Sequence, residues 1–306
     1  MNTLFFIESF PNEISCRSHF RDVRIKQGVV CKKCGSNSHI WLPSKWQFEC
    51  KSCHFRTTLR SGTMMENSNL PFRMWYLTVF FMTMTKKGIS ACEMQRQLNY
   101  KRYKTVWELM HKIRLLMGKR EQMYKLTDMI EFDEGYFETS YSQSGRSLLK
   151  RGKGSQRQEN VAILAESTPL ESIETGATSS HCRFFKMKIL ETQKAEAVNE
   201  FIEKSVETGG VIFSDKATNY VGIRKLEMEH IVEKSSKKTT VKTLKWVHIA
   251  ISNAKRAFLG VYHKIDSKYL QNYLDEFSYK LNRRYFKNLF ERVFIAGVFP
   301  YWYKCA

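Results

Sequence analysis

The sequence contains no apolar run long enough to cross a membrane. Its most hydrophobic stretch, residues 74–85 (MWYLTVFFMTMT), has the length of a buried helix and ends at Lys86 and Lys87, whereas a membrane span needs ~20 consecutive apolar residues. The opening MNTLFFIESF lacks the basic segment of a secretory signal, and Glu8 interrupts its apolar run. We therefore expect no membrane segment, no signal peptide and a cytoplasmic location.

Acidic residues are few relative to basic ones. The 306 residues include 30 Asp and Glu against 50 Lys and Arg, a formal net charge of +20, and the basic residues are spread over the whole length. A field of this sign attracts phosphate backbones. The sequence also lacks a lipidation motif or a long basic amphipathic helix, which would favour an anionic membrane. We therefore expect nucleic acid as the partner; a basic protein without a polyanionic partner is the alternative.

The cysteines indicate a metal site. Eight cysteines occur without an export signal, so we expect reduced thiols that bind metal rather than form disulfides. Four of them form two Cys-x-x-Cys pairs: Cys31 with Cys34, and Cys50 with Cys53. Two such turns joined by a hairpin complete the four-sulfur shell that Zn²⁺ accepts, and Trp46 and Phe48 alternate as in a strand between them. This predicts a zinc ribbon in residues 1–60 with a structural Zn²⁺. Four free buried cysteines are the alternative, and His54 could compete as a ligand.

Residues 61–125 have helical periodicity and predict three helices. Ser68 or Asn69 can cap the first helix, with Pro71 in its first turn and Gly88 at its end. The apolar pattern then resumes twice with helical period. This segment is expected to contact DNA.

The second and third predicted helices, residues 89–99 and 104–117, are joined by the basic turn YKRY. That spacing fits a helix-turn-helix, whose second helix presents its N-terminal end to DNA. The residues that it would present are Lys101, Arg102, Lys104 and Thr105. A simple helical hairpin is the alternative, and the net charge favours DNA contact.

Two aspartates lie in predicted strands of the second half of the chain. Residues 129–138 (MIEFDEGYFE) alternate polar and apolar, which predicts a strand with Ile130 and Phe132 facing a core and Asp133 on the opposite face. The segments predicted after it are a strand (183–191), a helix (195–208) and a strand ending at Asp215 (209–220). Because α/β folds gather active groups at the carboxyl edge of a sheet, we assign both aspartates to one α/β domain.

Two carboxylates held close together repel each other, so each needs a nearby cation to stay ionised. A divalent metal ion meets this need, since Mg²⁺ prefers a few carboxylates together with water and phosphate oxygens. A pair of metal ions can activate an attacking hydroxyl and neutralise the leaving oxygen of a phosphodiester. With the positive net charge, Asp133 and Asp215 predict phosphoryl transfer on nucleic acid. A solvated polar strand face is the alternative.

The order of these motifs resembles that of ISXO-type insertion-sequence transposases, relatives of the eukaryotic Merlin elements. The resemblance covers residues 15–290, and its most specific segment is residues 260–284 (GVYHKIDSKYLQNYLDEFSYKLNRR). It implies an α/β core of RNase H-like fold in residues 126–306, preceded by the zinc ribbon and the helical segment. It also implies a metal-dependent acidic triad of DDE type, which cuts transposon ends and joins them to target DNA. The implied partners are double-stranded DNA with terminal inverted repeats, target DNA and further copies of the chain, in association with the nucleoid.

The resemblance also assigns roles to individual residues. The two aspartates of the family match Asp133 in FDEGYF and Asp215 in FSDKATNY. The third member, usually Glu or Asn, lies seven residues before a lysine that matches Lys255, and this position is His248 here. A neutral imidazole can ligate metal, but it brings no negative charge and prefers softer ions than Mg²⁺. We therefore expect Mg²⁺ or Mn²⁺ at Asp133, Asp215 and His248, with better activity in Mn²⁺.

Two other residues are candidates for the third position of the triad. Asn253 lies two residues before Lys255, and Glu276 lies in a predicted helix near the end of the matched region. Lys255 and its neighbour Arg256 are expected to contact DNA phosphates as positive charges. An ordinary solvated basic patch is the alternative for these two residues.

Two basic segments, residues 144–158 and 234–242, are predicted loops that could approach the DNA backbone. In the family that the sequence resembles, the second of these lies near transposon-end DNA; plain surface loops are the alternative. The aromatic residues from 285 to 306 favour core packing or oligomer contact. Two functions compete with a transposase: a non-catalytic DNA-binding protein derived from one, and a nuclease of the same fold that cuts without joining.

Overall fold

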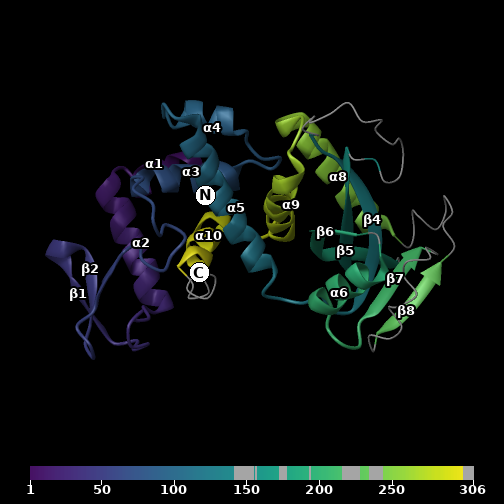
Figure 1. Cartoon of the computed structure of the whole chain (residues 1–306), viewed down its shortest axis with the longest axis horizontal. Helices are drawn as coiled ribbons and strands as arrows, with labels where there is room; N and C mark the ends of the chain where they lie inside the picture. Colours follow the sequence, from purple (N-terminus) through teal and green to yellow (C-terminus); the bar gives the residue numbers. More distant parts are fainter. Residues whose placement is uncertain are drawn as a thin grey trace. The chain divides into compact units, whose positions relative to one another are not determined.

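The computed structural model describes residues 1–140, 155, 157–171, 178–192, 194–215, 228–233 and 244–298 (Figure 1). The chain divides into two compact units. The first contains Met1–Met117 and Phe286–Ala306, and the second contains Gly118–Tyr285. Among the described residues, no helix combines the length and the apolar character that crossing a membrane requires.

The first unit is built mainly from helices. Their bounds are α1 (Thr3–Ser9), α2 (Glu13–Gln27), α3 (Phe72–Met84), α4 (Ala91–Gln97), α5 (Tyr103–Glu121) and α10 (Leu289–Gly297). The last residues of α5, from Gly118 on, belong to the second unit. Asn2, Asn12 and Ser90 cap α1, α2 and α4, because each side-chain oxygen accepts a hydrogen bond from a first-turn N–H group. Helices α3, α4 and α5 confirm the three helices predicted from the sequence.

Helix α3 receives its N-terminal cap from another helix. The Glu13 carboxylate of α2 accepts hydrogen bonds from the backbone N–H groups of Phe72 (3.0 Å) and Arg73 (2.9 Å). The prediction that Ser68 or Asn69 caps this helix is therefore wrong. The physical reason is that a carboxylate brought in by the fold satisfies the same orphan N–H groups more strongly than a neighbouring hydroxyl or amide.

The C-terminal helix α10 packs within the first unit through aromatic side chains. The Phe290 and Phe294 rings lie 5.8 and 4.2 Å from the Tyr76 ring of α3, measured between centroids. The His19 imidazole of α2 lies 2.7 Å from the Tyr76 hydroxyl and 3.1 Å from the Glu291 carboxylate. These contacts confirm the core-packing interpretation for Phe290 and Phe294, whereas Tyr285 and Phe286 are exposed.

A small antiparallel sheet follows α2. Its strands are β1 (His39–Leu42), β2 (Gln47–Cys50) and β3 (Arg56–Thr58), in the order β1-β2-β3, with a 3-10 turn (Pro43–Lys45) in the first hairpin. Trp41 pairs with Phe48 across this hairpin, and their ring centroids lie 4.8 Å apart. The guanidinium groups of Arg21 and Arg24 on α2 lie 5.8 and 5.3 Å from the Trp41 and Phe48 ring centroids. These cation–π contacts attach the small sheet to α2.

The second unit is built on a five-stranded mixed sheet. Its strands are β4 (Met129–Glu138), β5 (Gln158–Glu171), β6 (Thr178–Ile189), β7 (Val211–Asp215) and β8 (Glu229–Glu233), in the order β6-β5-β4-β7-β8. Strands β4, β5 and β6 pair antiparallel, whereas β7 pairs parallel with both β4 and β8. Helix α6 (Ala195–Ser205) precedes β7. The mixed sheet with its helices confirms the predicted α/β class.

One face of this sheet is closed by α6. Ile130 and Phe132 of β4 are fully buried there in one cluster with Val198 and Ile202 of α6. The predicted inward direction of Ile130 and Phe132 is therefore confirmed. Strand alternation then sends the odd-numbered residues of β4, including Asp133, to the other face.

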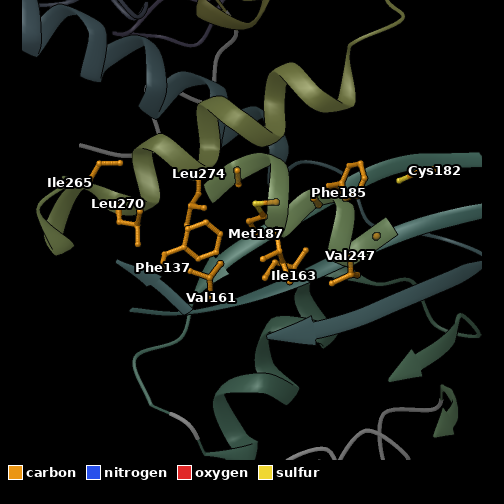
Figure 2. Close-up of a cluster of buried hydrophobic side chains, with 14 residues drawn as sticks. Phe137, Val161, Ile163, Cys182, Phe185, Met187, Val247, Ile265, Leu270 and Leu274 are labelled. Carbon is orange, nitrogen blue, oxygen red and sulfur yellow. The ribbon is translucent and has the colours of Figure 1, made fainter. Parts of the chain in front are cut away.

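The other face is covered by α8 (Lys245–Tyr262) and α9 (Ser267–Asn282). Phe137 of β4 is buried there together with Val247 of α8 and Leu274 of α9, and Figure 2 shows these apolar side chains between the sheet and the covering helices. Asp133 shares this face with Phe137, and only 17% of its side chain is exposed. The alternative of a solvated strand face is therefore wrong for Asp133, because helices cover the sheet on both sides.

Helix α9 also covers the free edge of β6. The Gln271 side-chain amide accepts a hydrogen bond from the Ile189 N–H and donates to the Met187 carbonyl. The Asn282 amide forms the same pair of bonds with the N–H and carbonyl of Phe185. Two amide side chains thus satisfy edge groups that would otherwise be open to pairing with another strand.

Candidate active site

Asp133 and Asp215 lie next to each other on adjacent parallel strands. The β4–β7 register pairs Phe132 with Ser214, and the two aspartates follow these residues on strands spaced about 4.8 Å apart. Ile130 and Ile212 are paired and buried on the α6 side, so alternation directs both aspartates to the face covered by α8. The parallel register therefore brings together two carboxylates that are far apart in the sequence.

The environment of Asp133 disfavours its charge. Burial raises the pKa of the Asp133 carboxyl group to about 6, and repulsion from Asp215 and Glu134 acts in the same direction. A hydrogen bond from the Glu134 N–H (2.8 Å) and the nearby His248 oppose this shift in pKa but do not cancel it. The Asp215 Oδ1 atom is buried and has no hydrogen-bond partner in the described part of the chain. A cation between these carboxylates would offset both the cost of charging Asp133 and the missing partner of the Asp215 oxygen.

His248 reaches the same place from α8. Its Nε2 atom lies 3.7 Å from Oδ2 of Asp133, and 39% of its side chain is exposed. The imidazole is thus close enough to share a ligand with Asp133 while still facing solvent on one side. The structure brings Asp133, Asp215 and His248 together at the α8-covered face of the sheet.

The other two candidates for the third position make different contacts. Asn253 accepts a hydrogen bond from the Arg256 guanidinium (2.9 Å) on the outer side of α8. Glu276 is buried on α9, and its carboxylate lies 3.5 Å from the Lys280 ammonium. Neither contact involves Asp133 or Asp215, so the geometry favours His248 over both.

Lys255 follows His248 by two helical turns and lies on the same side of α8. Its ammonium group is 5.6 Å from the centroid of the Phe137 ring. Phe137 lies near the C-terminal end of β4, four residues after Asp133. Lys255 and Arg256 are both exposed.

Glu131 is a site residue that the sequence analysis missed. Its Oε2 atom accepts hydrogen bonds from the backbone N–H groups of Trp246 (2.7 Å) and Val247 (3.0 Å), at the start of the helix that carries His248. Burial raises the pKa of Glu131 to about 7, although these two N–H donors lower it. The available signal was the spacing: residues 131 and 133 share one face of a strand.

The four predicted zinc ligands converge in the first unit. One ligand atom from each of Cys31, Cys34, Cys50 and Cys53 lies within 4.8 Å of the other three. The Sγ atoms of Cys31 and Cys53 are 3.6 Å apart, and those of Cys34 and Cys50 are 3.5 Å apart. A tetrahedral Zn²⁺ with Zn–S bonds of about 2.3 Å has sulfur atoms about 3.8 Å apart. The cluster is therefore compatible with Zn²⁺.

His54 does not join this cluster. Its side chain is 79% exposed, and Nδ1 lies 3.6 Å from the Glu49 carboxylate. The idea that it competes as a ligand is therefore not supported, because the four thiols already fill a tetrahedral shell.

The predicted DNA-contacting residues lie at the turn between α4 and α5. Lys101, Arg102 and Lys104 are exposed, and Thr105 is partly buried. Gln95 donates a hydrogen bond to the Lys101 carbonyl (3.0 Å), which fixes the turn. Lys104 has Glu108 at 3.9 Å on the same helix. The geometry is that of two helices joined by an exposed basic turn, as both a helix-turn-helix and a helical hairpin require.

Two predicted DNA-approaching segments fall almost wholly outside the described residues. These are residues 144–158, of which 155, 157 and 158 are described, and residues 234–242. The final aromatic residues, 299–306, also lie outside the described part.

The model of the ISXO2-like transposase domain matches residues 125–282, just over half of the chain. This region includes Asp133, Asp215 and His248. The chain therefore belongs to the ISXO2-like transposases.

A relative occurs in Halobacterium salinarum, where it is described as an uncharacterized protein in transposable element ISH50. It is 26% identical over 168 residues, which cover 51% of this chain and 55% of that protein. The match thus spans about half the length of each chain.

Two solved structures of the Mos1 transposase also show similarity. The Mos1 mariner paired end complex with Mn is 10% identical with a TM-score of 0.27, over 74% of this chain and 76% of that chain. The Mos1 strand transfer complex is 11% identical with a TM-score of 0.25, over 76% and 80% of the two chains. TM-scores this low do not establish a shared fold.

Proposed function

We propose that this protein is a DDE-type DNA transposase that cuts the ends of its insertion sequence and joins them to target DNA by metal-dependent phosphoryl transfer. The observation that carries the proposal is the convergence of Asp133, Asp215 and His248 on one face of the sheet, in a chain of the ISXO2-like family. The strand order supports an RNase H-like core: three antiparallel strands in chain order, and two parallel strands beyond the first of them.

The donor set suits a hard divalent cation. Two adjacent carboxylates and one imidazole are available, and the buried Oδ1 atom of Asp215 has no partner among the described residues. Asp133, Asp215 and His248 would hold Mg²⁺ or Mn²⁺, with His248 favouring Mn²⁺. When bound, the metal would supply positive charge beside the phosphate oxygens during the transfer and would lower the pKa of the attacking water or hydroxyl.

The proposed reaction has two balanced steps. In the first, a water oxygen bonds to phosphorus at the transposon end while the bond from phosphorus to the 3′ oxygen breaks, and a water proton passes to that oxygen to give a free 3′-hydroxyl. In the second, the oxygen of this hydroxyl bonds to a target phosphorus while a target phosphorus–oxygen bond breaks, and the hydroxyl proton passes to the leaving oxygen. The number of phosphodiester bonds is conserved in the second step, so joining needs no energy-rich co-substrate. Asp133 and Asp215 orient the reacting groups, and Lys255 with Arg256 would hold the flanking phosphates.

The first unit would bind DNA. Four cysteines close a structural Zn²⁺ site without an open coordination position, so they stabilise the ribbon and take no part in the chemistry. Lys101, Arg102 and Lys104 would contact the terminal inverted repeats from the α4–α5 turn. By the resemblance to transposases, the active form would be a homo-oligomer on double-stranded DNA.

The test is a cleavage and joining assay on duplexes that carry the inverted repeats flanking the gene, with Mg²⁺ or Mn²⁺ added. We expect cut ends and joined products, and Asp133→Asn should abolish both because it removes a charge needed to hold the metal. Asp22→Asn, an exposed aspartate of α2, is the matched control and should retain activity. Specific binding without cleavage would instead favour a non-catalytic DNA-binding protein, and cleavage without joining would favour a nuclease.

A second arm of the assay tests His248. If its imidazole ligates the metal, His248→Ala should slow cleavage by at least about tenfold, the scale at which even outer-shell partners of a metal act. The wild-type protein should also work faster with Mn²⁺ than with Mg²⁺. Equal rates in both metals together with an unaffected His248→Ala variant would remove His248 from the site.

A further inference from the structure

Helix α8 begins without a side-chain cap from its own described residues. Leu244 occupies the N-cap position and its side chain cannot accept a hydrogen bond. The first N–H groups of a helix have no intrahelical acceptor and must be satisfied from elsewhere. At α8 the Glu131 carboxylate of β4 accepts from two of them, at Trp246 and Val247. Only 4% of Glu131 is exposed, so water is not a ready substitute.

Residues of β4 that point toward α8 meet successive turns of that helix. Asp133 lies 3.7 Å from His248, and a Cβ atom on Gly135 would lie 3.4 Å from Ile251. Next along the strand, the Phe137 ring has the Lys255 ammonium 5.6 Å from its centroid.

Helix α8 therefore runs beside β4 in the same direction. From Asp133 to Phe137 the strand advances about 13 Å, and from His248 to Lys255 the helix advances about 10.5 Å. Gly135 stands where the strand and the helix leave little room for a side chain: a Cβ there would also be 3.3 Å from side-chain atoms of Ile163 and Phe137 in the sheet.

The position of His248 depends on how α8 is placed on β4. A slip of one residue would rotate a helical side chain by about 100° and move it about 1.5 Å along the axis. His248 directly follows Val247, whose N–H is held by Glu131. The hydrogen-bonded end of the helix is thus the part that fixes the direction of the imidazole.

From these contacts we propose that Glu131 is a positioning residue: its carboxylate fixes the register of α8 on β4 and so holds the His248 imidazole against Asp133. The structural part of this inference concerns only β4 and α8, whereas its effect on DNA cleavage rests on the proposed function. Glu131 itself does not touch the reacting atoms. It acts through the helix that carries His248.

The test compares Glu131→Ala with Glu131→Gln. Alanine removes the carboxylate oxygen that accepts both hydrogen bonds, whereas the glutamine amide oxygen can accept from the same two N–H groups. Without metal or DNA, Glu131→Ala should speed hydrogen exchange at Trp246, Val247 and His248 about five- to tenfold, while β5 keeps its protection. Glu131→Gln should restore most of the protection. Unchanged exchange in Glu131→Ala, or no recovery in Glu131→Gln, would overturn the proposal.

The cleavage assay separates this inference from the proposed function. Glu131→Ala should lower the cleavage rate at saturating DNA about tenfold with little change in the DNA concentration for half-maximal rate, and Glu131→Gln should recover most of it. Glu13→Ala, which removes the equivalent cap of α3, is the matched control and should cleave normally. A slow Glu131→Ala variant with wild-type exchange in α8 would assign Glu131 a different role. If the wild-type protein does not cleave at all, the proposed function fails, and the exchange data still decide whether Glu131 positions α8.

Discussion

Two helices of this protein begin in the same way but in different surroundings. Helix α3 of the first unit and helix α8 of the second both receive a glutamate from another element, which accepts hydrogen bonds from two first-turn N–H groups. Glu13 is 32% exposed at its side chain and also pairs with Arg17 at 3.1 Å. Glu131 is almost fully buried, and burial raises its pKa to about 7.

The two capping glutamates differ in how far their carboxylates are buried. The carboxylate at α3 is solvated and paired, so capping the helix costs little. In the second unit, burial raises the pKa of three carboxyl groups well above their usual values: Glu131 and Asp275 to about 7, and Asp133 to about 6. Carboxyl groups with pKa values shifted by burial cluster at functional sites. The second unit thus bears a cost of burying carboxyl groups that the solvated Glu13 cap of the first unit does not.

Removing Zn²⁺ should have the largest effect, and only in the first unit. A structural Zn²⁺ on four thiolates contributes about 10 kcal/mol or more to the folding of a small ribbon. A strong chelator, or Cys50→Ser, should therefore abolish the hydrogen-exchange protection of β1–β3 while β4 and β5 keep theirs. Cys92→Ser, at an exposed cysteine of α4, is the control. If metal analysis shows that no zinc is bound and β1–β3 still keep their hydrogen-exchange protection, the four-sulfur zinc site is contradicted.

The raised pKa values of the second unit should make it less stable as the pH rises. A carboxyl group whose folded pKa is raised binds its proton more tightly in the folded state, so the unfolded state holds fewer protons between the two pKa values. For Asp275 the pKa rises from 3.8 to about 7. The stability that Asp275 contributes through its tightly held proton is fully present below pH ~4 and is lost as the pH rises through about 7.

Asp275→Asn tests this dependence on pH. Without added Mg²⁺ or Mn²⁺, the free energy of unfolding of the second unit should decrease from pH 5 to pH 8. In the variant this decrease should be smaller by roughly 2–3 kcal/mol. Hydrogen exchange in β5, measured at the two pH values and corrected for the intrinsic rate, reports the change. The exposed aspartate variant Asp22→Asn should leave the slope unchanged. If Asp275→Asn behaves like this control, burial at Asp275 is not the source of the dependence.

Local patterns in the sequence predicted much of the fold. The alternation of residues 129–138 predicted β4, and the Cys-x-x-Cys spacing predicted four thiols in one place. Helix α6 ends at Ser205, within the predicted range of 195–208. Each of these elements depends on neighbours in the sequence, so its signal lies within a short window.

The caps of α3 and α8 could not be predicted, because their partners are distant in the sequence. Glu131 and Trp246 are 115 positions apart, and nothing in either segment indicates the pairing. The β4–β7 register was hidden for a related reason: a slip of one residue would send Asp215 to the opposite face. The pattern of α10 was likewise ambiguous, since its aromatic residues left core packing and oligomer contact both open.

The smallest effect is expected from Glu13→Ala, which decides whether the two caps really differ. Loss of the cap should lower the free energy of unfolding of the first unit by about 1 kcal/mol and speed hydrogen exchange at Phe72 and Arg73. DNA cleavage should stay within about twofold of wild type, because α3 carries none of the proposed site residues. Glu13→Gln should restore the stability. If Glu13→Ala slows cleavage as strongly as Glu131→Ala, general destabilisation explains both variants, and the special role of the cap on α8 is lost.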